Sequence, residues 1–379
     1  MNPQHKEQEE ESRFLPGKLP PEKYALILKT GQATLDRAQV QLATVLANHP
    51  TLLVISDIDA VLGDVQIHNV LSSSTPQNLA DASHLANRDR AHTGDNDAST
   101  QEFDVLDTQW GEGWNNDARK FFPGLRLAHD KFPNVDWYVL IDDDAFVFLD
   151  NLSDYLGVID PNNALYFGLV SEVLPSPAAC GATEERNQFI YGGSGIVISK
   201  IAMAMLMEVI DLCIADPALW NCWAGDVALG MCMYKANISL LQGVGFHSMP
   251  VTSPDYQFVQ PACEPPKIVH KLNTKQMEKL FNHVMQQPHK TITTGDVYRL
   301  FHDIKNDEPF EVFHNDTNFH GLEYWTGAKK SEEECHKTCL DDKNCVTWIF
   351  FPFAFQCYLK GTVDPLGIAS PGTGYKAGI

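Results

Sequence analysis

The sequence predicts an α/β fold with a parallel sheet, followed by a small cysteine-rich domain. An apolar run at Tyr24–Lys29, helical spacing over 34–48 and a second apolar run at Thr51–Ser56 follow one another, which is the order of a βαβ unit. The continuous run Trp137–Ile141 is typical of a strand buried on both faces. Near residue 315 the composition changes, because Gly, Thr and clustered Cys become frequent. These observations predict one large domain and one small one.

The remaining elements follow in order along the chain. After the second apolar run, residues 72–104 are rich in Ser, Asn, Asp and Ala without periodicity, which indicates either a functional loop or a disordered insertion. The Met-rich stretch 201–213 has the spacing of a core helix. Further helices are expected at 117–131, 149–159 and Lys271–Met285, a strand at Leu165–Val170, and a glycine-rich turn between two apolar runs at Phe189–Lys200.

Composition and charge exclude several classes of protein. The 379 residues include 28 Lys and Arg against 49 Asp and Glu, a formal net charge of −21. So acidic a chain lacks the basic surface that nucleic-acid binding needs. It also has no apolar run of the ~18 residues that a membrane span requires. The polar first residues exclude a secretory signal peptide, but the clustered Cys predict disulfides, so we expect a protein of an oxidising compartment that has lost its targeting segment.

Three adjacent carboxylates directly follow the Trp137–Ile141 run. Ligands of an open α/β sheet bind at the carboxyl ends of its strands, and Asp142–Asp144 lies at such an end. Oxygen ligands at this spacing suit a hard divalent cation such as Mg²⁺ or Mn²⁺. An acidic turn without a metal is the alternative interpretation. The strand before the triplet and the amphipathic helix after it favour a metal site.

Four segments in order resemble glycosyltransferase family 31, which includes core 1 β1,3-galactosyltransferase and the Fringe enzymes. They are WYVLIDDDAFVFLDNL, FIYGGSGIVIS, AGDVALGMCM and KIVHKLNTKQMEKLF, and the resemblance covers about residues 22–290 and is closest to the fungal and plant branches, especially fungal members. It implies a GT-A fold, a Rossmann-like mixed sheet flanked by helices. It also implies a metal-dependent, inverting transfer, of the β1,3 type, from a UDP-sugar to a hydroxyl of a glycan or glycoprotein.

The resemblance also implies a set of metal ligands. Asp144 is expected to bind the metal directly, with Asp142 acting through water or the ribose. Asp143 is expected either to contact the donor or to be an exposed turn carboxylate. Of two candidates for the late metal-binding His, His270 in IVHKL is preferred to His247 in GVGFHSMP, which would then line the acceptor cleft.

Asp226 matches the family's catalytic acidic residue. As general base it would take the proton of the acceptor hydroxyl, and direct displacement with one base implies inversion at the anomeric carbon. Without the resemblance, a carboxylate stabilised by the start of a helix would be the better interpretation. Trp220 and Trp223 flank Asp226 and are candidates for a sugar platform on the acceptor side, although burial is the commoner fate of Trp. The expected donor-binding residues are Thr30, Gly31, Asp57, Lys120, Asp143, Gly192 and Gly193, with Gly195 beside them.

The C-terminal segments NFHGLEYWTG and CHKTCLDDKNCVTWIFFPFAFQCYLK resemble a PAN/Apple module, a small α+β domain stapled by disulfides. This resemblance implies the pairs Cys335–Cys357 and Cys339–Cys345. The resemblance to the transferase family implies Cys213–Cys232, and Cys180–Cys263 is a guess. A zinc site is the alternative, but no Cys-x₂-Cys spacing supports it.

The expected protein is thus a luminal Golgi or secreted glycosyltransferase that uses Mn²⁺ or Mg²⁺. Its expected partners are a UDP-sugar and a glycan or glycoprotein acceptor, and the module is expected to bind carbohydrate or protein. The alternatives are a transferase with another nucleotide donor and a catalytically inactive glycan-binding protein on a transferase fold. The expected parts are a stem or tail at 1–19, the GT-A domain at 20–290, a linker at 291–315 and the PAN/Apple-like domain at 316–379.

Overall fold

The chain forms two compact units. They are Met1–Ser248 with Lys267–Asn282, and Met249–Pro266 with His283–Ile379. The predicted stem at 1–19 and the segment 72–104 lie, except for Lys18, Leu19 and Ser72, outside the described residues. The computed structural model describes residues 18–72, 113, 116–173, 180–253, 256, 263–288, 290–303, 313–318, 323–345, 347–361 and 370–378.

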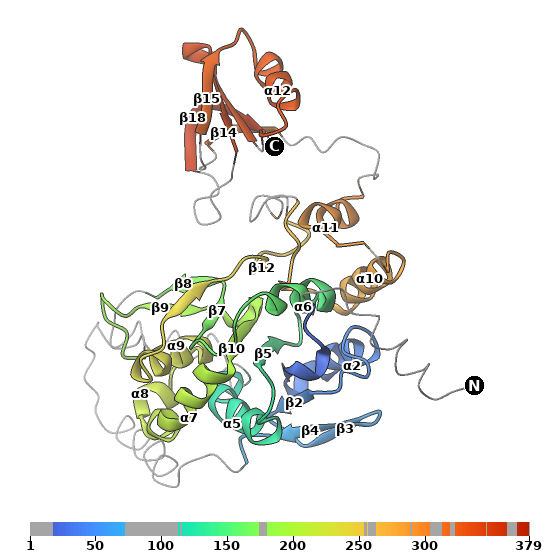
Figure 1. The fold of residues 1–379 in the computed structure, drawn as a ribbon, viewed down its shortest axis with the longest axis vertical. Coiled ribbons are helices and arrows are strands. Elements are labelled where there is room, and N and C mark those ends of the chain that lie inside the picture. Colours follow the sequence, from blue (N-terminus) through green and yellow to red (C-terminus); the bar gives the residue numbers. More distant parts are fainter. Residues whose placement is uncertain are drawn as a thin grey trace, which may run out of the picture. The chain divides into compact units, whose positions relative to one another are not determined.

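The first unit is built on an eight-stranded mixed sheet with the strand order β11-β7-β10-β5-β1-β2-β4-β3 (Figure 1). β1 runs parallel to both β2 and β5, so the expected βαβ unit is present. β10 is antiparallel to β5 and β7, which makes the sheet mixed, as the resemblance implied, rather than purely parallel. The strands are β1 (Tyr24–Lys29), β2 (Leu52–Ser56), β3 (Ala60–Leu62), β4 (Val65–Asn69), β5 (Trp137–Asp142), β7 (Tyr166–Gly168), β10 (Ile196–Ser199) and β11 (Leu240–Gln242).

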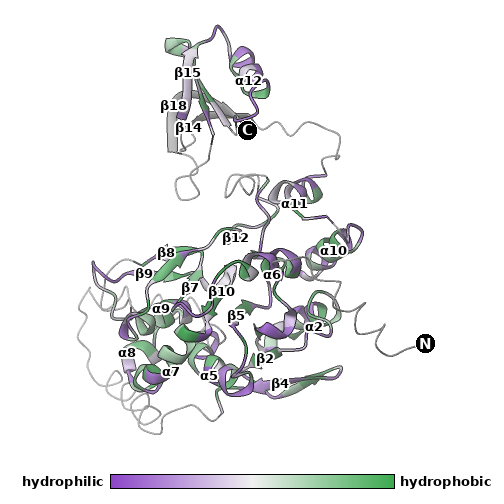
Figure 2. Ribbon diagram, in the orientation of Figure 1, coloured by the Kyte–Doolittle hydropathy of each residue, from purple (hydrophilic) through white to green (hydrophobic). Residues whose placement is uncertain are grey.

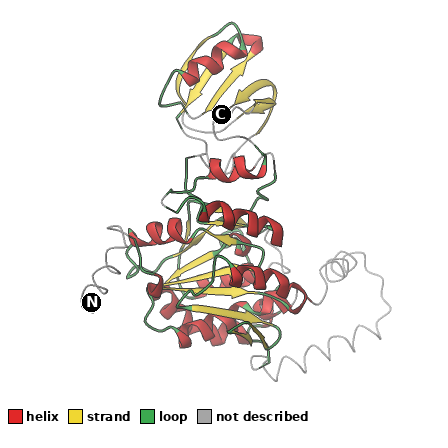
Figure 3. Ribbon diagram, turned by 90° about the vertical axis from the view of Figure 1, so that its right-hand side faces the viewer, coloured by secondary structure: helices red, strands yellow, loops and turns green. Residues whose placement is uncertain are grey.

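Helices cover both faces of this sheet (Figure 3), and alternate residues of its central strands enter two separate hydrophobic clusters. In β5, Tyr138 and Leu140 pack with α5, α7 and α9. Trp137, Val139 and Ile141 pack with α2 and α6 on the other face. Burial on both faces explains the continuous apolar run, and α7 and α9 are themselves largely hydrophobic (Figure 2). The helices are α2 (Leu35–Ala43), α5 (Phe121–Lys131), α6 (Leu149–Gly157), α7 (Lys200–Ala215), α8 (Pro217–Trp220), α9 (Gly225–Lys235) and α10 (Thr274–Met285).

Two small sheets complete the strands of the first unit. One has the order β12-β13-β6, and the other pairs β8 with β9. Among the described residues, no helix combines the length and the apolar character that crossing a bilayer needs. The strands are β6 (Phe146–Val147), β8 (Val170–Glu172), β9 (Gln188–Ile190), β12 (Phe246–His247) and β13 (Ile268–Val269).

The second unit contains a five-stranded antiparallel sheet, with the order β14-β18-β16-β17-β15, and the helix α12. Trp348, Phe350 and Leu359 of the sheet form one small core with Cys335 and Cys339 of α12. The helix α11 (Thr294–Phe301) lies in the stretch expected as a linker. The other elements are β14 (Phe313–Asn318), β15 (Glu323–Ala328), α12 (Glu332–Leu340), β16 (Thr347–Phe351), β17 (Gln356–Lys360) and β18 (Ser370–Gly378).

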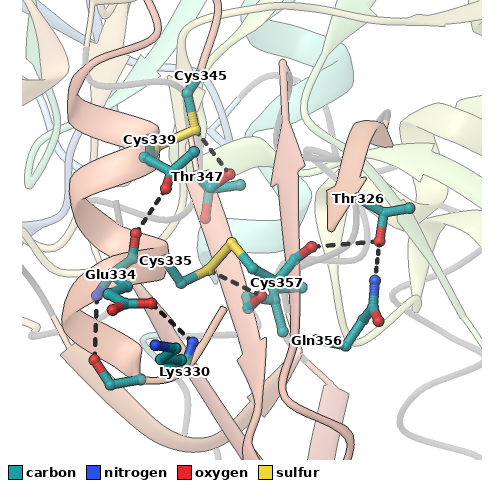
Figure 4. Close-up of a disulfide and its surroundings, with 12 residues drawn as sticks. Thr326, Lys330, Glu334, Cys335, Cys339, Cys345, Thr347, Gln356 and Cys357 are labelled. Atoms are coloured by element: carbon teal, nitrogen blue, oxygen red, sulfur yellow. Dashed lines mark hydrogen bonds between the residues drawn. A yellow bond between two sulfur atoms is a disulfide. The ribbon is translucent and has the colours of Figure 1, made fainter. Parts of the chain in front are cut away.

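Two disulfides staple this small core (Figure 4). Cys335 of α12 is bonded to Cys357 of β17, and Cys339 is bonded to Cys345. These are the pairs that the resemblance to the module implied. A core this small needs such cross-links to be stable.

Two further disulfides lie in the first unit. Cys213–Cys232 links α7 to α9, which is the pair implied by the family resemblance. The guess Cys180–Cys263 is wrong, because Cys180 is bonded to Cys222, with 5.2 Å between their Cα atoms, and Cys263 is an exposed free thiol. The 42-residue separation of Cys180 and Cys222 gave no signal in the sequence, since only the fold brings them within bonding distance.

Candidate active site

A cavity of about 640 Å³ opens at the carboxyl ends of β1, β2 and β5. The pairing of β1 with β5 places Lys29 beside Asp142, so that the loops after these strands meet. Thr34 of the first βα connection, Arg37 of α2 and the Gly192-Gly193 turn line the same cavity. The expected site residues among its lining are Gly31, Asp57, Lys120, Asp142, Asp143, Asp144, Gly192, Gly193, Asp226 and His270.

Asp142, Asp144 and His270 form a group that is able to hold a metal ion, with one ligand atom of each within 4.8 Å of the others. The β13–β6 pairing brings His270 back to the acidic turn, where the Leu272 amide donates to the Asp144 carbonyl over 2.9 Å. His270 Nε2 lies 2.9 Å from Asp144 Oδ1. Burial raises the pKa of Asp144, but His270, Arg37 and Lys29 together outweigh it and hold this pKa below its usual value. The structure therefore brings together the three residues predicted to hold the metal.

Gly193 packs directly against the His270 ring. A Cβ added at Gly193 would lie 2.2 Å from Cε1 of His270 and 2.5 Å from Nε2, which is closer than real contacts. Position 193 therefore requires glycine, because the His270 ring occupies the space that a Cβ would need.

We expect Gly193→Ala to weaken Mn²⁺ binding by about 10–100-fold. The added Cβ would displace the His270 ring, and changing a residue that supports a metal ligand typically costs this much. The measurement is calorimetric titration of Mn²⁺ into the protein without donor. Gly361→Ala is the control, since a Cβ there meets nothing closer than 3.5 Å. Unchanged Mn²⁺ affinity in folded Gly193→Ala protein would contradict this assignment of His270.

The middle carboxylate of the triplet is held by the first βα connection. Asp143 accepts a hydrogen bond from the Thr30 hydroxyl at 2.7 Å and another from Thr34. Arg37 Nη1 lies 3.6 Å from its other oxygen. Burial raises the pKa of Asp143, although the two hydroxyls oppose that shift. Asp143 lines the cavity, but both of its oxygens are engaged, so it orders the loop around Thr30 and Thr34.

Lys29 is a buried cation that the analysis of the sequence missed. Its Nζ lies 3.0 Å from Asp142 Oδ1 and also pairs with Asp117. Burial alone would lower the pKa of Lys29, but Asp117 and Asp142 raise it above its usual value. The sequence feature that could have pointed to Lys29 is its place as the one charged residue at the end of the apolar run YALILK, just as Asp142 ends the run WYVLID.

A second buried cation, Lys120, lies on the wall formed by the loops after β1 and β2. Its Nζ donates to the Thr30 carbonyl at 2.7 Å and lies 3.5 Å from Asp57 Oδ1. The same Asp57 oxygen accepts from the Gln32 amide at 3.0 Å. Burial would raise the pKa of Asp57, but Lys120 and these hydrogen bonds lower it. The predicted donor residues Gly31, Asp57 and Lys120 thus line one wall of the cavity, and Thr30, which is buried and does not line it, is joined to this wall through Lys120.

Asp226 is half-buried in the first turn of α9 and lines the same cavity. Its two oxygens accept hydrogen bonds from the Gly192 amide at 2.8 Å and the Val227 amide at 2.9 Å. Burial raises the pKa of Asp226 to about 6, against the effect of these two hydrogen bonds. A carboxyl group with that pKa is ionised at neutral pH and still basic enough to accept a proton.

The residues expected on the acceptor side do not line this cavity. His247 is fully buried in β12, and burial lowers its pKa to about 3. Trp220 is buried, and Trp223 is 41% exposed. Gly195 has a φ of +90° and packs against Ile268, so glycine at this position allows the positive φ and the close contact with the core.

The fold and the cavity define an α/β domain with an Asp-Asp-His group and a half-buried carboxylate in a cavity at the strand ends. The Fringe-like family model matches residues 92–292, and the chain belongs to this family. The family match identifies this domain as a glycosyltransferase.

Chondroitin sulfate synthase 3 of Mus musculus is 22% identical over 118 residues, which are 31% of this chain and 13% of that protein. The chain thus matches about an eighth of the length of this curated relative. A solved glycosyltransferase involved in the glycosylation of the major capsid of PBCV-1 aligns over 69% of this chain and 100% of its own, with 11% identity and a TM-score of 0.35. An active-site mutant of LgtC aligns over 66% of this chain and 87% of its own, with 12% identity and a TM-score of 0.33.

Proposed function

We propose that this protein is a metal-dependent, inverting glycosyltransferase that moves a sugar from a UDP-sugar to a hydroxyl of a glycan or glycoprotein, with a β1,3 linkage. The observation that carries the proposal is that the Asp142, Asp144 and His270 group and the half-buried Asp226 carboxylate line one cavity. The Asp-Asp-His group fits a metal that binds the diphosphate, and Asp226 fits a base for the acceptor hydroxyl.

The residues present fit Mn²⁺ or Mg²⁺. Two carboxylates and one imidazole are ligands that such cations accept. The cavity lining carries six Asp against four Lys and Arg, so a diphosphate would meet net repulsion without an added cation. Nδ1 of His270 is buried and has no hydrogen-bond partner among the described residues, and Gly193 packs against the ring, so the ring's position is fixed by packing. A bound divalent cation supplies Lewis-acid stabilisation of the charge that develops on the departing diphosphate.

The protein's own groups divide the remaining work. Lys120, Asp57 and Gly31, with Thr30 joined to them through Lys120, form the wall that we assign to uridine and diphosphate. Asp226 takes the proton of the acceptor hydroxyl as its oxygen attacks the anomeric carbon on the face opposite the diphosphate. A single attack from that face inverts the anomeric configuration. The amides of Gly192 and Val227 hold the carboxylate in place for this step.

The second unit and the cysteines support the rest of the proposal. Eight of the nine cysteines form disulfides, which persist in oxidising compartments, so we place the protein in the Golgi lumen or outside the cell. The helix and sheet stapled by Cys335–Cys357 and Cys339–Cys345 fit a PAN/Apple module that binds carbohydrate or protein. The likeness of the chain to fungal members of the transferase family is part of the same proposal.

A screen of UDP-sugars tests the proposal. We expect UDP and at least one UDP-sugar to bind in the presence of Mn²⁺, and EDTA to remove that binding. The readouts are calorimetric affinity and slow release of UDP by hydrolysis of the bound donor. Tight binding of a glycan together with no binding of any UDP-sugar would contradict the transferase and favour a glycan-binding protein.

A further inference from the structure

Two side chains of α2 and that of its N-cap residue Thr34 reach the acidic turn Asp142–Asp144. Thr34, Arg37 and Gln41 follow one another at spacings of three and four residues, so they share a helical face. Thr34 donates to the carboxylate of Asp143. Arg37 Nη1 lies 3.6 Å from Asp143 Oδ1 and 3.9 Å from Asp144 Oδ2.

Gln41 is hydrogen-bonded to the backbone of the same turn. Its Nε2 donates to the carbonyl of Asp143 at 2.8 Å and to that of Asp142 at 3.2 Å. The Asp142 carbonyl also accepts from the Ala145 amide at 3.1 Å, which closes the turn. Among the described residues, the Gln41 side chain thus donates to these two backbone carbonyls and to neither flanking carboxylate.

The burial of Gln41 is costly for a residue with only a packing role. Its side chain is fully buried, and Oε1 has no hydrogen-bond partner among the described residues. Burying an amide with an unsatisfied oxygen is unfavourable, and an apolar side chain of the same size would avoid that cost. The two hydrogen bonds to the turn are the compensation that the structure shows.

We infer that Gln41 is a positioning residue for the metal site, which rests on the proposed function. With Thr34 and Arg37 it fixes the backbone and the middle carboxylate of the turn against α2. The flanking carboxylates of Asp142 and Asp144 are thereby held at the separation from His270 that a shared ion requires.

Gln41→Met tests the inference, because Met has nearly the same shape and no donor. We expect Mn²⁺, titrated without donor, to bind about 10–100-fold more weakly. We also expect faster hydrogen–deuterium exchange at the Ala145 amide, measured without any metal. Ala38→Gly is the control, since Ala38 is buried in α2 and the change weakens the helix without removing a contact to the turn. It should lower the melting temperature and leave both readouts near wild type.

A second variant tests whether Gln41 and Thr34 act through one turn. Thr34→Val removes the hydroxyl donor to Asp143 and keeps the shape. If both residues hold the same turn, the losses of Mn²⁺ affinity in the double variant should fall short of the sum of the single losses.

The outcomes separate the inference from the proposed function. Wild-type exchange at Ala145 and wild-type Mn²⁺ affinity in folded Gln41→Met would overturn the positioning role and leave the transferase proposal standing. If wild-type protein binds no Mn²⁺, the proposed metal dependence fails. The exchange at Ala145 then decides whether Gln41 holds the turn: unchanged exchange overturns the inference, and faster exchange supports it.

Discussion

Replacing Asp226 with Asn is expected to lower the rate of sugar transfer by ~10²–10⁴-fold, while UDP-sugar affinity stays near its wild-type value. Asn keeps the size of the side chain and an oxygen for one of the two amides, Gly192 or Val227, but it cannot take up the proton of the acceptor hydroxyl. The measurement is single-turnover transfer. Hydrolysis of the donor by water can replace it while the acceptor is being identified.

The pH profile checks the same assignment independently. A general base works only when deprotonated, and burial raises the pKa of Asp226 to about 6. The value of kcat/KM should therefore fall as the pH drops through about 6 and be level above it. The residual activity of Asp226→Asn should lack this inflection. A profile that rises towards low pH would indicate an acid in place of a base.

The alternative role of Asp226 is that of a helix-start carboxylate, which would contribute only ~0.5–2 kcal/mol to stability. Asp150→Asn makes the same chemical change in the first turn of α6, outside the cavity, and is the matched control. It should leave transfer unchanged. Transfer at the wild-type rate by Asp226→Asn, with chemistry rate-limiting, would place the base elsewhere.

Asp144→Ala is expected to abolish Mn²⁺-dependent binding of UDP. The change removes one of the two carboxylates of the metal group, so the loss should exceed the ~10–100-fold that supporting residues typically cost. Calorimetric titration of UDP with Mn²⁺ and with EDTA measures the effect. Asp154→Ala, which removes an exposed carboxylate from α6, is the control.

The two histidines extend this test. His270→Ala should weaken metal binding more than His247→Ala, because His270 lies 2.9 Å from Asp144 and His247 does not line the cavity. The reverse ranking would exchange their roles. Equal affinity for UDP with Mn²⁺ and with EDTA, unaffected by Asp144→Ala, would show that the site binds nucleotide without a metal.

Local patterns were sufficient for the elements that position this site. The apolar runs that form β1, β2 and β5 could be recognised in the sequence, because a strand buried on both faces must be continuously apolar. The acidic triplet was readable because polar residues at the end of such a strand need a ligand or a counter-charge. Family resemblance added His270 and Asp226, which no local pattern distinguished from a core histidine and a helix-start carboxylate.

The same patterns failed where an answer depends on residues far apart in the chain. Lys29 and Asp142 are neighbours only through the pairing of β1 with β5, so the buried ion pair had no signal beyond the charged end of each run. Asp143 appeared equivalent to its two neighbours in the triplet. Its hydrogen bonds to Thr30 and Thr34 turn it towards the first loop, and this depends on where α2 packs.

The sequence by itself thus determined the α/β class and the strand ends that carry the acidic triplet. The tertiary structure alone decided the Cys180–Cys222 disulfide and the packing of Gly193 on His270. It also decided which side of α2 holds the acidic turn. The physical reason is that periodicity and strand ends are local properties of the chain, whereas strand register, side-chain direction and burial are fixed only when distant segments pack together.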